Sequence, residues 1–93
     1  MTRKIRKSRR FLKDYEKARK QKKDIKRLKE IISLLANRQK LPQSCKEHYL
    51  IGDYKGSLEC HISNDWLLIY KVFPEEDLLI LERLGTHNEL FNY

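Results

Sequence analysis

The interval between apolar residues changes once along this chain, and that change limits the possible folds more than any other feature. In the first half, apolar residues recur every three or four positions, which is the period of one helix face. The pattern predicts a helix over 9–21, with Ser8 as its N-cap, and a second helix from Asp24 to about Asn37. Because the break at 21–23 is short, the two helices are expected to form a hairpin.

Strand spacing governs the second half of the chain. Apolar and polar residues alternate over 58–62, and residues 66–73 are apolar at nearly every position, as in a strand covered on both faces. A further strand is expected over 78–83, ended by Gly85, and turn-forming residues separate these strands. The tail is expected to form a short helical turn, and residues 2–6 are interpreted as a short strand.

These elements together predict one α+β domain over residues 1–93. It consists of a short N-terminal strand, a two-helix hairpin and an antiparallel meander, with the helices packed on one face of a small sheet of four to five strands. A chain of 93 residues can bury a single small core. The opposite face of the sheet is then expected to be open and to serve as a binding surface.

The positive charge is confined to the N-terminal third. The net charge is +8, yet residues 1–30 hold 15 basic and 4 acidic residues, whereas residues 31–93 hold 6 and 9. Such a block favours a polyanion such as RNA or DNA, although an acidic protein partner also fits. The alternative interpretation is a solvated helix surface with no partner.

Several classes of protein do not fit the composition. The N-terminus is basic, but no apolar stretch follows it, so a secretory signal is not expected. No segment approaches the roughly 20 apolar residues of a membrane span, and no membrane partner is expected. Two cysteines do not make a disulfide framework. These features predict a cytoplasmic protein with reduced thiols.

All three histidines lie in the second half of the chain. His61 alternates with apolar neighbours, so it should point to the open face of the sheet. Hairpin geometry could bring it near Asp65, Arg83 and His87. Cleavage of RNA without metal needs a base, an acid and a cation, which histidine and arginine can supply. The alternative is that these are scattered surface histidines.

Aromatic residues near these positions could hold a nucleobase by stacking. Trp66 and Phe91 are candidates, and so is Tyr93, although a lone tryptophan is more often a core residue. A zinc site is the competing interpretation, because Cys45 and His48 have ligand-like spacing. Adjacent strand residues point to opposite faces, so the Cys60 and His61 side chains cannot easily share one metal, and no metal or other cofactor is predicted.

Longer motifs in the second half resemble those of a known family. They are His48-Tyr-Leu…Gly52…Gly56, then Glu59-Cys-His61-Ile-Ser-Asn-Asp65-Trp66-Leu-Leu-Ile-Tyr70-Lys, and Glu82-Arg83-Leu-Gly85-Thr86-His87-Asn-Glu-Leu90-Phe91. In residue types and spacing they are similar to the YafQ-type branch of the RelE/ParE toxin superfamily. The order of the N-terminal strand and helical hairpin agrees as well, so the resemblance implies a RelE-like fold over the whole chain.

The resemblance implies a bacterial, cytoplasmic toxin of a type II toxin–antitoxin pair that cuts mRNA on the ribosome without metal and so inhibits translation. By matching position, it implies an acid–base set of His48, His61, Asp65 and His87. His87 is the implied proton donor to the leaving oxygen. Arg83 is implied to hold the scissile phosphate, and Trp66 and Phe91 to shape the site.

The resemblance also implies partners. The antitoxin is expected to be a small acidic DNA-binding protein, and operator DNA is expected to be bound only through the toxin–antitoxin complex. The basic helices are expected to face ribosomal RNA, far from the chemistry. The lysines expected to do so are Lys13, Lys17, Lys20, Lys22, Lys23 and Lys26.

Departures from the family pattern and two other activities remain open. Ser57 and Leu58 stand where the family usually has an aromatic residue and an arginine, so a second phosphate contact is expected to be missing. Asn64 replaces the proline usual in the turn. A ParE-like inhibitor of DNA gyrase could use the same fold but would not need the histidines. A non-catalytic RNA-binding module would need only the basic helices.

Overall fold

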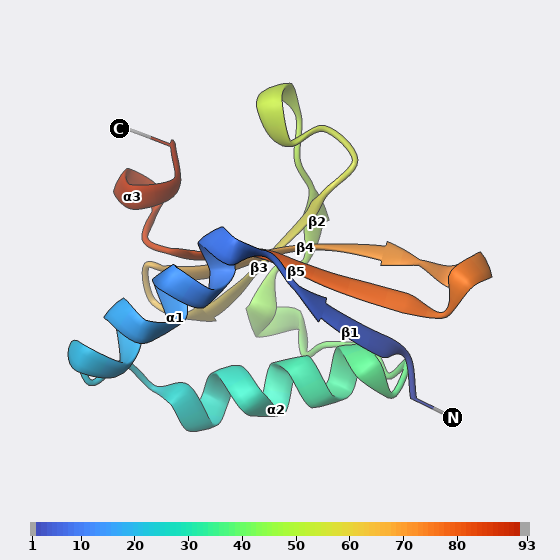
Figure 1. The fold of residues 1–93 in the computed structure, drawn as a ribbon, viewed down its shortest axis with the longest axis horizontal. Helices are drawn as coiled ribbons and strands as arrows, with labels where there is room; N and C mark the ends of the chain where they lie inside the picture. Colours follow the sequence, from blue (N-terminus) through green and yellow to red (C-terminus); the bar gives the residue numbers. More distant parts are fainter. Residues whose placement is uncertain (1, 92–93) are drawn as a thin grey trace.

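The protein was analysed as a computed structural model that describes residues 2–91, so Tyr93 lies outside the described residues. Strands and helices follow one another in the predicted order (Figure 1). They are β1 (Lys4–Lys7), α1 (Arg9–Lys20), α2 (Ile25–Ala36), β2 (His48–Tyr49), β3 (Leu58–Ser63), β4 (Trp66–Phe73), β5 (Leu78–Gly85) and α3 (His87–Phe91). Short 3₁₀ turns lie at Gln43–Cys45, Gly52–Tyr54 and Pro74–Glu76.

Both predicted helix starts are confirmed. The Ser8 hydroxyl accepts a hydrogen bond from the Phe11 N–H at 3.0 Å, and the Asp24 carboxylate accepts one from the Arg27 N–H at 3.0 Å. Each cap satisfies one of the backbone donors that a helix start leaves unpaired. The second helix ends at its predicted boundary, with Asn37 as the C-cap.

The sheet has five strands in the order β1-β5-β4-β3-β2. β1 runs parallel to β5, and the remaining neighbours are antiparallel. The sequence placed the first strand at 2–6, shifted from its observed position. It missed β2, because two residues are too few to show a period. It also ended the last strand at 83, whereas β5 continues through Gly85, which remains hydrogen-bonded opposite Leu67.

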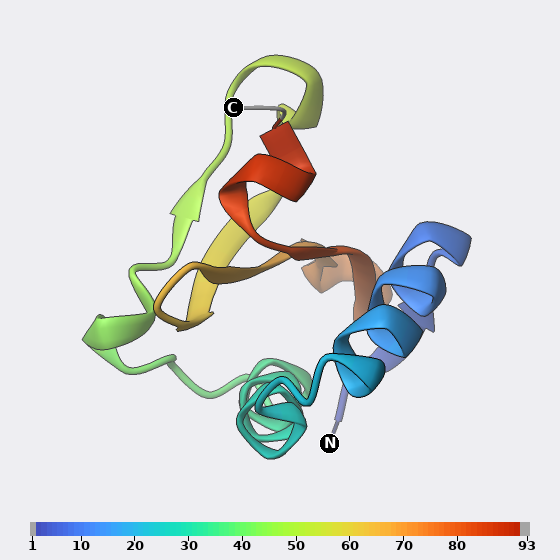
Figure 2. The ribbon, with the colours of Figure 1, turned by 90° about the vertical axis from the view of Figure 1, so that its left-hand side faces the viewer.

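The main core lies between the sheet and the two long helices, which cover one face (Figures 1 and 2). Most of the helix-face residues that the period predicted pack there, including the buried Phe11, Leu28 and Ile31, whereas Leu12 is 48% exposed. From the sheet, Cys60 and Tyr70 point into the same core. Within residues 2–91, no helix combines the length and apolar character needed to cross a membrane.

The opposite face of the sheet is only partly open, contrary to the prediction. Leu67 and Ile69 of β4 point to this side and pack with Leu90 of α3, and Tyr54 and Phe91 close over them. Figure 1 shows α3 and the segment containing the Gly52–Tyr54 turn rising from the side of the sheet away from α2. This second, smaller cluster fixes the position of α3 and leaves the histidine-bearing part of the face beside it.

Candidate active site

His87 and Asp65 form a hydrogen-bonded pair at the centre of the site. Asp65 lies in the tight turn between β3 and β4, and its Oδ1 lies 2.5 Å from His87 Nδ1 and 3.2 Å from the His87 N–H. The hydrogen bond from the His87 side chain holds the pKa of Asp65 below its ordinary value, with the backbone N–H adding to the effect. The carboxylate is therefore ionised at neutral pH and fixes the imidazole orientation.

A capping box sets the position of His87. The Thr86 N–H donates to Glu89 Oε1 at 2.9 Å, and the Glu89 N–H donates to the Thr86 hydroxyl at 3.2 Å. This reciprocal pair starts α3 at His87. Gly85 lets the helix approach, because a Cβ there would lie 3.1 Å from Glu89 Oε1. The Gly-Thr-His-x-Glu stretch therefore places the imidazole by local hydrogen bonds.

His61 faces His87 across the sheet surface. Its ring lies 5.9 Å from the His87 ring, between centroids, at an interplanar angle of 60°. The neighbouring Cys60 side chain is fully buried on the helix side, whereas His61 is half-exposed, so the predicted orientation of His61 is confirmed. His61 Nδ1 lies 3.4 Å from the Asn64 carbonyl oxygen, which orients the ring.

His48 reaches the same face through Glu59. The two residues are opposite each other in the β2–β3 pairing, and His48 Nε2 lies 3.4 Å from Glu59 Oε1. Glu59 is only 3% exposed, and its Oε2 atom has no hydrogen-bond partner among residues 2–91. A buried carboxylate with one unpartnered oxygen is unusual, since such groups are normally paired.

Arg83 is held by an ion pair that the sequence did not reveal. Its Nε donates to Asp14 Oδ2 at 2.8 Å, and its Nη2 donates to Asp14 Oδ1 at 3.3 Å. A further donor, Nη1, lies 3.4 Å from the Tyr54 hydroxyl. The hydrogen bond to Asp14 raises the pKa of Arg83 above its ordinary value. The guanidinium predicted to hold phosphate is thus already neutralised by α1.

The two aromatic candidates, Phe91 and Trp66, differ in exposure and lie on opposite faces of the sheet. Phe91 is half-buried and packs edge-on against Tyr54, with ring centroids 5.9 Å apart, and beside His87 at 6.2 Å. Trp66 is 3% exposed and belongs to the helix-side core. A buried indole cannot stack on a nucleobase, so the base-stacking role predicted for Trp66 is wrong. Its burial follows from strand alternation, which points it away from the histidines.

The resemblance implied that the basic helices lie far from the chemistry, but two of the lysines assigned to them lie beside the site. Lys17 of α1 pairs with Glu89 of α3, and this contact lowers the pKa of Glu89. Lys23 lies close enough to Asp65 to contribute to lowering its pKa. The other lysines assigned to ribosomal RNA are exposed on the two helices and the turn between them: Lys13, Lys20, Lys22 and Lys26. Basic side chains therefore border the site.

Three residues of the site were not recognised in the sequence as parts of it: Glu59, Asp14 and Tyr54. Glu59 gave one signal, because it shares the strand period of His61. Asp14 and Tyr54 gave none, since they are far from Arg83 along the chain. Two residues that depart from the family pattern make structural contacts. Ser57 is buried and donates a hydrogen bond to the Glu82 carboxylate, and Leu58 packs against the main core.

Comparison with known proteins assigns the family. The model of the family described as "Bacterial toxin of type II toxin-antitoxin system, YafQ" matches residues 3–92. The chain belongs to this YafQ toxin family. Its relatives include the mRNA interferase toxin YafQ of Escherichia coli strain K12, which is 43% identical over 82 residues, or 87% of each chain.

Solved structures of YafQ and of a similar toxin share this fold. YafQ from Escherichia coli BL21(DE3) superposes with a TM-score of 0.89 at 41% identity and covers 96% of this chain and 98% of its own. The Escherichia coli DinJ–YafQ toxin–antitoxin complex gives 0.87 at 41%, covering 98% and 99%. A metal-bound toxin from Helicobacter pylori gives 0.89 at 39%, covering 96% and 99%. The predicted RelE-like α+β fold is therefore confirmed.

A zinc site built on the cysteines does not fit this YafQ toxin. Both thiols are buried, Cys60 completely, and Cys60 and His61 lie on opposite sides of β3. Burial raises the pKa of the Cys60 thiol well above its ordinary value, so the thiolate that a metal needs is disfavoured. The cysteines are structural residues of the helix-side core.

Proposed function

We propose that this protein is a cytoplasmic bacterial toxin that cleaves mRNA bound to the ribosome and needs no metal for the reaction. The observation that carries the proposal is the Asp65–His87 pair facing His61 on the sheet surface opposite the long helices. The similar Escherichia coli toxins are named mRNA interferases. The cluster supplies the proton-transfer groups that such a reaction requires.

In the proposed reaction the 2′-OH of one nucleotide attacks the adjacent phosphorus, and the bond to the 5′ oxygen breaks. The products are a 2′,3′-cyclic phosphate and a 5′-OH end. His87 donates the proton to the leaving 5′ oxygen. Asp65 supports this role because it holds the Nδ1 side of the ring, which directs Nε2 toward the substrate.

A second group takes the proton of the 2′-OH. His61 faces His87 directly, while His48 reaches the same surface through the buried Glu59 carboxylate. Because His87 is assigned as the acid, the candidates for the base are His61, His48 and Glu59. A pH–rate profile assigns the role: substitution of the base removes the limb of the profile that rises with pH, whereas substitution of a positioning group lowers the whole curve.

Arg83 and Phe91 are proposed to hold the substrate. A planar guanidinium can bind two phosphate oxygens, and Arg83 would exchange part of its contact with Asp14 for the phosphate. Phe91 lies beside His87 and presents a half-exposed ring on which a base can stack. The exposed lysines of α1 and α2 would bind ribosomal RNA, and that binding should weaken steeply with salt.

The test compares His87→Ala with Asn88→Ala, a matched change at the next, exposed position of α3. Purified variants are incubated with ribosomes carrying an mRNA, and primer extension maps the cut sites. We expect discrete cuts within the reading frame for the wild type and for Asn88→Ala, and none for His87→Ala. EDTA should leave the wild-type cuts unchanged.

Other outcomes would identify the competing activities. Undiminished cleavage or growth arrest by His87→Ala would contradict the assignment of His87. Intact mRNA with stalled replication after induction would identify a gyrase inhibitor. Toxicity that persists after replacing all three histidines would identify a non-catalytic RNA-binding module.

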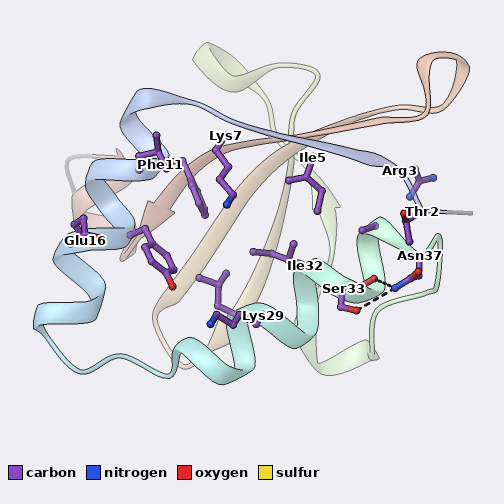
Figure 3. Close-up of a pocket in the computed structure, with 14 residues that line it drawn as sticks. Thr2, Arg3, Ile5, Lys7, Phe11, Glu16, Lys29, Ile32, Ser33 and Asn37 are labelled. Atoms are coloured by element: carbon purple, nitrogen blue, oxygen red, sulfur yellow. Dashed lines mark hydrogen bonds between the residues drawn. The ribbon is translucent and has the colours of Figure 1, made fainter.

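The proposed protein partner is a small acidic antitoxin, and the structure offers it a groove between β1, α1 and α2 (Figure 3). The groove has a volume of about 630 Å³ and is lined mainly by apolar side chains, including Ile5 and Leu12, which are 41% and 48% exposed. Arg3, Lys7 and Lys29 also line it, against one acidic residue, Glu16, so its net positive charge complements an acidic segment. β1 is an edge strand, to which an extended chain can add.

Antitoxin binding is tested with Ile5→Glu combined with Leu12→Glu. The matched control is Ile51→Glu, at an apolar residue that is 91% exposed elsewhere on the surface. We expect the groove variant to lose at least about tenfold in antitoxin affinity while mRNA cleavage is retained. Equal affinity in both variants would place the antitoxin elsewhere. Operator DNA should be retarded in gels by the complex and not by the toxin alone.

A further inference from the structure

A polar pocket of about 370 Å³ adjoins the site at His61. Its walls come from the start of α2, from the Gln43–Cys45 turn with the residue after it, and from the end of β3 with the turn that leads to β4 (Figure 2). Its polar lining residues are Arg27, Ser44, Lys46, His61, Ser63 and Asn64. This cavity is called the His61 pocket below, and its volume lies within the range of pockets that bind small ligands.

The lining of the His61 pocket is positively charged. Arg27 and Lys46 carry two positive charges, and no acidic residue of the described chain lines the pocket. Ser44, Ser63 and Asn64 are exposed and add hydroxyl and amide donors. Cationic and neutral donors gathered around one cavity suit a phosphate group.

Arg27 is the more enclosed of the two cations, with a side chain that is 30% exposed. Its Nη2 donates to Cys45 Sγ at 3.8 Å, a weak acceptor that orients the guanidinium without neutralising it. Its ion pair with Glu30, at 3.4 Å, is weak because the Glu30 side chain is 52% exposed. Arg27 can therefore exchange Glu30 for a phosphate more easily than Arg83 can exchange Asp14, since that pair is only 13% and 17% exposed.

The segments that line the pocket also orient two candidate bases of the reaction. The Lys46 carbonyl oxygen lies 2.8 Å from His48 Nδ1, and the Asn64 carbonyl oxygen lies 3.4 Å from His61 Nδ1. The β3–β4 register shifts between His61 and Ser63, and bulges next to active sites commonly re-aim side chains. The same backbone therefore positions the pocket and both imidazoles, so a ligand held in the pocket lies beside the candidate bases.

The positions of base and acid give the direction of the RNA. In the proposed reaction the base takes a proton from the 2′-OH of the nucleotide on the 5′ side of the cut, and His87 protonates the oxygen on the 3′ side. His61 lines the pocket, whereas His87 is not among its lining residues. RNA that leaves the cut in the 5′ direction therefore passes the His61 pocket.

We propose that the His61 pocket binds an mRNA phosphate, the one on the 5′ side of the nucleotide that supplies the attacking 2′-OH. This inference rests on the proposed function and deepens it. Leu58, which packs against the main core, cannot provide a second phosphate contact, and Arg27 and Lys46 would supply it instead. Binding at this point holds the attacking ribose against His61.

The test combines protein variants with two mRNAs. Arg27→Gln and Lys46→Gln each remove one charge from the pocket, and Lys40→Gln is the matched control at an exposed lysine outside it. One mRNA has an uncharged methylphosphonate in place of the proposed phosphate, and the other has the ordinary phosphate. Both carry a 2′-O-methyl group on the ribose before that linkage, which protects it from internal attack. Cleavage is measured on ribosomes that carry each mRNA.

On the mRNA with the ordinary phosphate, we expect Arg27→Gln to raise KM at least about tenfold with kcat nearly unchanged, because a contact to a charged group that is equal in ground and transition states is lost. Lys46→Gln should raise KM at least about threefold, and Lys40→Gln should change it by less than about twofold. On the methylphosphonate mRNA the wild-type KM should rise, and Arg27→Gln should add less than about twofold, since the two changes remove one interaction.

Two results would overturn the assignment. One is additivity, in which Arg27→Gln raises KM as much on the methylphosphonate mRNA as on the ordinary one. The other is an equal loss of affinity for ribosomes without mRNA, which would assign the phosphate to ribosomal RNA. Circular dichroism and thermal unfolding verify folding, and if Arg27→Gln is unfolded, the exposed Lys46→Gln decides both comparisons.

A binding assay separates this inference from the proposed function. A short RNA with 2′-O-methyl riboses cannot be cleaved, so its affinity, measured by fluorescence anisotropy, reports binding alone. We expect Arg27→Gln to bind it more weakly than Lys40→Gln does. A protein that never cleaves mRNA refutes the proposed function, and equal affinity of these two variants for the short RNA then overturns the pocket as well. A nuclease that shows additive losses refutes the inference alone.

Discussion

Removal of the Asp14 carboxylate is expected to destabilise the protein by about 2 kcal/mol. Asp14 accepts two hydrogen bonds from Arg83 and a third, at 3.0 Å, from the Leu84 N–H. Loss of one partner costs roughly 3–5 kcal/mol in a fully buried pair and about 0.2–1 kcal/mol in an exposed pair. The side chains of Arg83 and Asp14 are 13% and 17% exposed, so Asp14→Ala should fall between these limits.

The expected loss of stability corresponds to a lower melting temperature, by an amount that depends on the size of the domain. Each kcal/mol shifts the Tm of a domain of this length by roughly 4–8 °C, so Asp14→Ala should melt about 10 °C below the wild type. Urea unfolding, followed by the fluorescence of the buried Trp66, gives the free energy of unfolding. Asp53→Ala, at an exposed carboxylate, is the matched control and should change stability by less than about 0.5 kcal/mol.

A double-mutant cycle with Arg83→Met isolates the ion pair. We expect a coupling free energy above about 1 kcal/mol, because either single change leaves a half-buried charge unpaired and the double change leaves none. The reasoning is refuted if Asp14→Ala lies within about 0.5 kcal/mol of the wild type, or if the two substitutions are additive. The same variants report on function: Asp14→Asn frees the guanidinium, so RNA affinity should rise and its salt dependence should steepen.

Three further changes are expected to have measurable effects. Gly85→Ala crowds the start of α3, because the new Cβ would lie 3.1 Å from Glu89 Oε1 and 3.3 Å from both Glu89 Cβ and Leu90 Cδ2. The small shift of α3 that relieves this crowding should lower cleavage at least about tenfold, with roughly 1 kcal/mol lost in urea. Tyr70→Phe removes the buried hydroxyl that donates a hydrogen bond to Glu47, and it should lower the free energy of unfolding by about 1–2 kcal/mol in the same urea assay. An unchanged free energy of unfolding would contradict this hydrogen bond. The Lys17 ammonium lowers the pKa of Glu89, so this pair stabilises the protein above the ordinary carboxyl pKa, and the stabilisation is lost as pH falls through the lowered value. Glu89→Gln should therefore show a flatter stability profile as pH falls below the ordinary carboxyl pKa of 4.5, and an unchanged slope would contradict the pairing.

Local patterns in the sequence predicted most of the secondary structure and the orientation of His61 in the site. The caps at Ser8 and Asp24 involve residues within three positions of each other, so they can be recognised without a fold. The orientation of His61 follows from strand alternation in the same way. β2 could not be predicted, because a strand of two residues has no period.

How deeply each side chain on the two sheet faces is buried could not be predicted from the strand pattern alone. The same alternation that exposes His61 buries Trp66, whereas the stacking role had been assigned to Trp66 because it is an aromatic residue close to the candidate site. Glu59 points to the face of His61 yet is only 3% exposed, and Leu90, Phe91 and Tyr54 cover part of that face. Such covering is set by long-range packing, which a residue pattern does not record.

The sequence by itself identified the candidate histidines, the order of the secondary-structure elements and the positive charge of the first third of the chain, since each is a property of neighbouring residues. Only the tertiary structure paired Arg83 with Asp14, residues separated by 69 positions, and brought Lys17 against Glu89. It also turned three acid–base groups into a cluster within 4.8 Å. The physical reason is that charge and hydrogen-bond energies depend on distance in space, and the chain fixes that distance only when the helices and the sheet pack.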